Sequence, residues 1–118
     1  MQSYGIIMYG VRLKNCIKDD HESDFNFLEI IDRDFGGNYE IPVKINGGKT
    51  VCLNFEKTYS EELIGYTAGY PWSFVSLNEV FIKPEDVEEA LIKLLTKYGF
   101  FEDSVKDAIE YICTTSDE

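Results

Sequence analysis

Acidic side chains are the most numerous groups in this sequence that could take part in chemistry. The 118 residues include 22 Asp and Glu against 11 Lys and Arg, so the formal net charge is −11. Residues 1–59 carry 9 acidic and 7 basic side chains, a net charge of −2, whereas residues 60–118 carry 13 and 4, a net charge of −9. Charge of this sign attracts basic partners and disfavours direct contact with phosphates. We therefore expect a basic protein partner and no direct binding of nucleic acid.

The acidic excess falls mainly on two helices predicted for the C-terminal third of the chain. If both apolar stripes turn inward, one outer face carries Glu85, Asp86, Glu88, Glu89, Glu102, Asp103, Asp107 and Glu110. Such a face either keeps the protein soluble and complements the helix dipoles, or docks onto a basic site. Carboxylates on successive helical turns repeat about every 5 Å, near the phosphate spacing of one nucleic-acid strand. The pattern is therefore compatible with mimicry of nucleic acid.

A second candidate is the aromatic segment 65–74, which contains Tyr66, Tyr70, Trp72 and Phe74. Two glycines and a proline interrupt it, which indicates a loop. The loop either folds back over the sheet to close the core, or leaves Tyr70 and Trp72 exposed as binding anchors. An exposed Trp72 beside carboxylates would suit an arginine-rich partner through cation–π contact.

No motif for catalysis, for a cofactor or for a metal ion emerges from the spacing of the reactive residues. The only histidine, His21, lies among carboxylates in a polar segment, and the acidic run that begins at Asp19 lacks the Gly and Glu positions of a calcium-binding EF-hand. The letters Asp34-Phe35-Gly36 are typical of a helix end, and Gly47-Gly48-Lys49-Thr50 is better explained as a hairpin turn than as a phosphate loop. We expect no enzyme.

The three cysteines form no CxxC pair, which favours reduced thiols and a cytoplasmic protein. Cys52 falls in a predicted strand and Cys113 beside the apolar stripe of a predicted helix, so we expect both to be partly buried apolar side chains. No run of apolar residues has the length of a membrane span, and residues 1–14 lack the features of a signal peptide.

The elements that must position these groups follow from hydrophobic periodicity. Residues 4–13 are apolar on both alternating sets, as in a central strand covered on both faces. A helical turn is expected over 25–33, with Ser23 or Asp24 as N-cap, and Val80-Phe81-Ile82 as a short extended run. Residues 60–63 form a helical turn at most, and Thr114 to Glu118 are expected to fray.

Residues 39–55 carry the clearest local signal, two alternating runs around Gly47-Gly48 that predict a hairpin. A two-residue loop would split both apolar faces, so we expect a three-residue loop, Gly47-Gly48-Lys49. This loop pairs Ile45 with Val51, Val43 with Leu53 and Ile41 with Phe55. Pro42 cannot donate to a ladder, so the first hairpin strand is expected to lie at an edge or to turn this residue outward.

Two helices are predicted after Pro84. The first buries Val87, Ala90, Leu91, Leu94, Leu95 and Tyr98, and the second starts near Asp103 or Ser104 and buries Val105, Ala108, Ile109 and Ile112. Only residues 99–101 separate the two, so they form an αα-hairpin. The prediction is one α+β domain over 1–118, with a small, mainly antiparallel sheet packed against helices.

The function expected from these features is that of a non-catalytic acidic domain that blocks a basic, nucleic-acid-binding site on a partner protein. Small acidic domains of this kind include phage-encoded inhibitors of host defence such as anti-CRISPR proteins, an analogy of size and charge. The alternatives are a small-molecule-binding or enzymatic domain with a pocket under the loop 65–74, and a self-assembling accessory protein joined through the Pro42 edge or Trp72.

Overall fold

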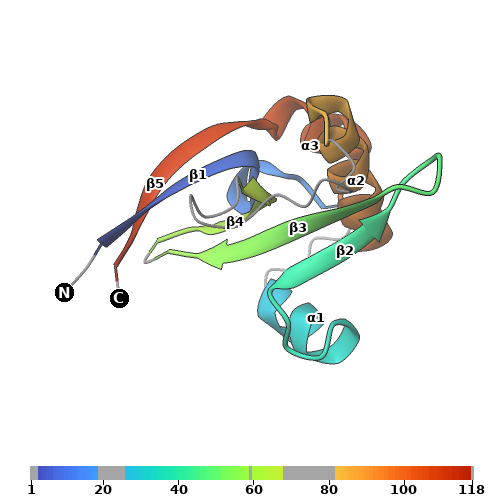
Figure 1. Ribbon diagram of the computed structural model, residues 1–118. Coiled ribbons are helices and arrows are strands. Elements are labelled where there is room, and N and C mark those ends of the chain that lie inside the picture. Colours follow the sequence, from blue (N-terminus) through green and yellow to red (C-terminus); the bar gives the residue numbers. More distant parts are fainter. Residues whose placement is uncertain (1–2, 19–25, 59, 68–81, 118) are drawn as a thin grey trace.

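The computed structural model describes residues 3–18, 26–58, 60–67 and 82–117. Five antiparallel strands form one sheet in the order β2-β3-β4-β1-β5 (Figure 1). The strands are β1 (Ser3–Arg12), β2 (Glu40–Lys44), β3 (Thr50–Lys57), β4 (Glu62–Thr67) and β5 (Glu110–Asp117). The helices are the 3₁₀ turn η1 (Leu13–Asn15), α1 (Phe27–Asp34), α2 (Pro84–Lys97) and α3 (Glu102–Ala108). The predicted α+β class is thus confirmed.

The main core lies between one face of the sheet and the three α-helices. Apolar side chains of β1 to β4, such as Val11, Leu53 and Ile64, pack there against a buried stripe of α2. This stripe is the predicted one and consists of Val87, Ala90, Leu91, Leu94 and Leu95, with Tyr98 partly buried beside it. Phe27 of α1 stacks on Phe55 of β3, with ring centroids 5.5 Å apart. We call this side of the sheet the helix face.

The opposite face of the sheet holds a smaller buried cluster. Met8 of β1, Leu63 of β4 and Ile112 of β5 pack together there and are almost fully buried. β1 therefore buries side chains on both faces between β4 and β5, which confirms the predicted central strand.

The hairpin is confirmed, but the predicted register is wrong by two residues. Val43 pairs with Val51 and Ile41 with Leu53, and the Ile45 amide donates to the Lys49 carbonyl. The three loop residues are thus 46–48 rather than 47–49. The slip is an even number of residues, so all the apolar side chains still share the helix face. Pro42 does lie on an edge strand, because β2 ends the sheet.

Strand β4 overturns the expected helical turn at 60–63 and the expected loop from residue 65. Gly65 lies directly opposite Gly10 in the β1–β4 ladder. A Cβ atom at Gly65 would lie 2.5 Å from the Tyr9 carbonyl oxygen and 2.6 Å from the Gly10 Cα. Gly65 is therefore needed for a close approach of two strands, rather than for a turn.

The C-terminal segment corrects a second prediction. The two consecutive helices are present, but α3 ends at Ala108, and Ile109 already has extended backbone angles. Residues 110–117 form β5, which pairs with β1 along its whole length from Gly10↔Glu110 to Ser3↔Asp117, so the described residues 114–117 are strand rather than a frayed end. Ile112 is buried against Met8, not within a helical stripe. The apolar residues 105, 108, 109 and 112 have the i, i+3, i+4, i+7 spacing of a helix, and this spacing did not show where α3 ends and β5 begins.

Smaller corrections concern α1 and the thiols. The N-cap of α1 is Asn26, whose side chain accepts a hydrogen bond from the Leu28 amide at 3.0 Å. Gly36 and Gly37 have positive φ after the helix, which confirms the interpretation of 34–36 as a helix end.

Cys52 and Cys113 are exposed, not partly buried, while Cys16 is buried. The run 80–82 was expected to be extended; its first two residues lie outside the described residues, and Ile82 belongs to no strand.

Candidate functional site

Four of the predicted acidic residues line one open groove of about 450 Å³ on the surface. Glu85, Glu88 and Glu89 come from the first half of α2, and Glu102 is the first residue of α3. Only residues 98–101 separate α2 from α3, and this short turn lets Glu102 line the same groove as the three α2 glutamates. The rest of the lining is Asn46, Ile92 and Lys93.

Two of the groove carboxylates are held in place by groups from the sheet. Glu88 accepts a hydrogen bond from the hydroxyl of Tyr9 at 2.8 Å, and Glu89 accepts one from the backbone amide of Asn46 at 2.7 Å. These contacts fix the N-terminal half of α2 to β1 and to the hairpin loop. The groove therefore has carboxylates whose positions are set before any partner binds.

Two lysines lie at the groove and offset part of its negative charge. Lys93 donates to the backbone carbonyl of Lys44, and Lys106 lies 3.7 Å from Glu102 as an exposed i, i+4 pair. A pair of this type contributes little binding energy in water. None of the ion pairs seen among the described residues involves Glu85, Glu88 or Glu89, and a lining of four glutamates and one lysine has a net negative charge.

Two other predicted site residues are ion-paired away from the groove. Asp86 accepts from the Lys49 ammonium at 2.8 Å and from the Lys83 amide at 3.0 Å, and both contacts lower the pKa of its carboxyl. Glu110 lies on β5, on the face away from the helices, and pairs with Arg12. The expectation that all eight carboxylates share one outer helical face is therefore wrong for these two.

Asp103 and Asp107 are exposed on α3 and do not line the groove. Tyr70, Trp72, His21 and the acidic run from Asp19 lie outside the described residues. Within the described part of the chain, no group of three or more His, Cys, Asp or Glu side chains could hold a metal ion. None of the described helices has the length and apolar character needed to cross a membrane.

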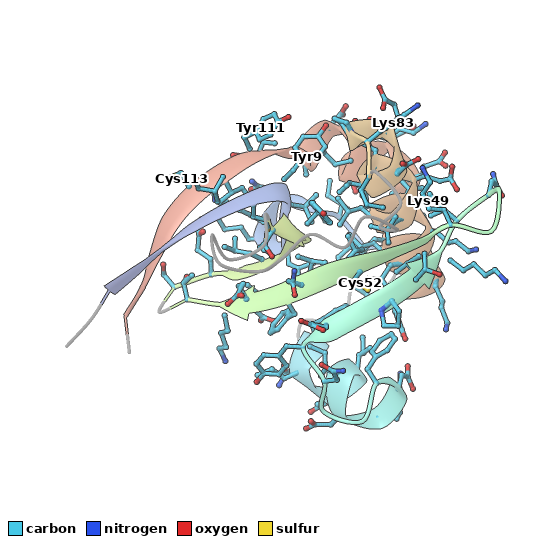
Figure 2. All side chains as sticks on the ribbon, in the orientation of Figure 1. Tyr9, Lys49, Cys52, Lys83, Tyr111 and Cys113 are labelled. Carbon is cyan, nitrogen blue, oxygen red and sulfur yellow. The ribbon has the colours of Figure 1, made fainter. Side chains whose placement is uncertain are left out.

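A pair of tyrosine rings in tilted contact adjoins the groove and was not predicted. Tyr9 of β1 and Tyr111 of β5 lie side by side, with ring centroids 4.6 Å apart (Figure 2). Tyr111 is 73% exposed, and its neighbour Ile7 on the same face of β1 is 65% exposed. The aromatic and β-branched run 111–115 was a strand signal in the sequence, and assigning part of it to a helix concealed the pair.

The environment of Tyr9 gives a pH-dependent prediction. Burial, together with the hydrogen bond to Glu88 and its charge, raises the pKa of Tyr9 from 10.0 to about 12. The fold favours the neutral phenol, so this stabilisation is complete below pH about 10 and is lost as the pH rises through about 12. The pKa of Tyr98 is also raised to about 12, so we expect an ultraviolet titration of tyrosinate to show a component near pH 12 that Tyr9→Phe reduces by one tyrosine. A difference titration centred near pH 10 would contradict the Tyr9–Glu88 contact.

Comparison with protein-family models, with curated proteins and with solved structures finds no match. The class of the protein therefore follows from its own geometry. It is an α+β protein in which two consecutive helices present a groove lined mainly by glutamates, beside a pair of tyrosines of which Tyr111 is exposed.

Proposed function

We propose that this protein is a non-catalytic binding domain that docks its acidic groove onto a basic, nucleic-acid-binding surface of a partner protein. The observation that carries the proposal is the convergence of Glu85, Glu88, Glu89 and Glu102 on one groove. A cluster of like charge attracts a basic surface and speeds its association. The action that fits such a surface is inhibition by competition with DNA or RNA, as in phage-encoded inhibitors.

The position of the carboxylates supports binding over a purely solubilising role. Charges that serve solubility are usually interspersed with charges of the opposite sign. Here four glutamates and one lysine line the groove, and Glu88 and Glu89 are anchored, one by Tyr9 of β1 and the other by Asn46 of the hairpin loop. Glutamates that line one groove repel one another, and a cationic partner would relieve that repulsion on binding.

The test is capture of partners by the immobilised chain from a nuclease-treated bacterial lysate, washed at low and then at high salt. We expect a basic nucleic-acid-binding protein that is released by salt, because screening shortens the reach of exposed charges to about 10 Å at 0.1 M. Purified and returned to the chain, this protein should be displaced by added DNA or RNA. Affinity that is equal at low and high salt would contradict the proposal.

Charge reversal in the groove should weaken that complex. The double variant Glu85→Lys, Glu102→Lys removes two groove charges and leaves the anchored Glu88 and Glu89 in place. We expect about tenfold weaker binding, which corresponds to about 1.4 kcal/mol. The matched control is Glu29→Lys, Asp32→Lys on α1, where both side chains are exposed and the net charge changes equally. Equal weakening by the two double variants would show that only total charge matters, against a role for the groove.

A further inference from the structure

The two edges of the sheet differ in their protection against added strands. β2, at one edge, carries the exposed Pro42 and Lys44, and the Lys44 carbonyl accepts from Lys93. Proline and lysine at an edge discourage pairing with another chain. β5, at the other edge, is eight residues long and contains no Pro, Gly, Lys or Arg. Its outer backbone groups have no strand partner among the described residues.

The helix face beside this open edge is apolar. α2 covers β1 to β4, but the part of the helix face formed by Ile7, Tyr9, Tyr111 and Cys113 extends past it, with Tyr9 partly buried and the other three exposed (Figures 1 and 2). We call these four residues the edge patch. Tyrosine side chains have few rotatable bonds and bury a large area when a partner covers them, so they are typical anchors in binding sites.

Acidic groups adjoin the edge patch, which indicates that a partner bound there carries positive charge. The hydroxyl of Tyr9 donates a hydrogen bond to the groove residue Glu88, so the edge patch and the groove are in contact at this point. A second copy of this chain is disfavoured, because pairing β5 with β5 would bring together the acidic groups that adjoin the edge patch of each copy. Each copy would also bring a net charge of −11.

We propose that β5 binds an extended segment of a basic protein by strand addition. The segment forms backbone hydrogen bonds to the outer side of β5. Its side chains on the helix face contact Tyr111 and Cys113, and its lysines or arginines lie in the field of Glu85 and Glu88. Affinity comes from the backbone pairing and specificity from the alternating side chains. This inference rests on the proposed function, because it assumes the same basic partner. It adds how that partner is recognised.

The test uses a defined probe, a fluorescein-labelled, end-capped peptide in which lysine and valine alternate over eight residues, titrated with the full chain at low salt. Fluorescence anisotropy should show saturable binding that is lost when alternate peptide amides are N-methylated, because these no longer donate hydrogen bonds. Cys113→Lys sets a like charge beside the added strand and should weaken binding about tenfold. The matched control is Cys52→Lys, another exposed cysteine of the same sheet on β3, which should change binding less than twofold.

Each of the other possible results of these experiments supports or overturns strand addition to β5. Absence of binding by the native chain, equal binding of the N-methylated peptide, or equal effects of Cys113→Lys and Cys52→Lys would overturn strand addition. A native dimer in sedimentation that Cys113→Lys dissociates would replace the basic partner by a second copy. If only the double variant Glu85→Lys, Glu102→Lys loses peptide binding, the peptide binds the acidic groove and strand addition is wrong. If only Cys113→Lys loses peptide binding, the peptide adds to β5 and the groove does not contribute to its binding.

Discussion

Replacing Gly65 by valine is expected to lower the free energy of unfolding by about 3 kcal/mol, near the upper end of the usual cost of overpacking. Gly65 and Gly10 face each other across the β1–β4 ladder, where the two strands approach closely. A Cβ atom at Gly65 would meet the Tyr9 carbonyl oxygen at 2.5 Å, and backbone cannot rotate out of the way as a side chain can. The strands must therefore separate, which weakens the attachment of β1 to the rest of the sheet.

Urea denaturation followed by circular dichroism measures this change. The matched control is Gly36→Asn after α1, where φ is +61° and no atom lies within 4 Å of an added Cβ. Asparagine tolerates positive φ better than other residues do, so the control should cost less than about 1 kcal/mol. A Gly65→Val protein as stable as the Gly36→Asn protein would mean that the two strands are not in close contact at this point.

Phe27→Ala is expected to cost about 4 kcal/mol, in the range measured for large aromatic side chains removed from cores. Phe27 is fully buried and stacks on Phe55 of β3. Its ring also meets the edge of Tyr98 at a centroid distance of 6.1 Å. One side chain thus joins α1, the sheet and the end of α2, and its removal leaves a cavity where all three meet.

The control for Phe27→Ala is Phe101→Ala, a truncation of the same kind at a side chain that is 48% exposed. It should cost less than about 1 kcal/mol, because exposed positions leave no cavity. Thermal and urea unfolding of the two variants should therefore differ clearly. Equal costs would show that α1 does not pack against the sheet through Phe27, and would place this helix outside the main core.

Local patterns in the sequence predicted those parts of the fold in which one face of one element is buried. The stripe of α2, the apolar face of the hairpin and the edge position of Pro42 were all correct. The register slip in the hairpin left the faces unchanged, because a shift of two residues preserves alternation. Such features depend on neighbours in sequence, which a pattern records directly.

Pairings between distant segments were missed for a common reason. β5 pairs with β1 from the other end of the chain, and Gly65 meets Gly10 across 55 residues. A segment such as 105–112 satisfies helical spacing locally, and only the vacant side of β1 makes a strand the better choice for its end. Gly65 was interpreted as a breaker for the same reason, since the strand that requires its small size lies far away in sequence.

The sequence by itself determined that the protein is acidic, that most of the excess charge lies in its second half, and that it folds from a hairpin, an N-terminal strand and two consecutive helices. Only the tertiary structure decided which charges act together. Glu85, Glu88, Glu89 and Glu102 share a groove, whereas Asp86 and Glu110 are paired with Lys49 and Arg12. The physical reason is that composition fixes the number of charges, while their distances, and so their interactions, follow from how the helices and strands pack.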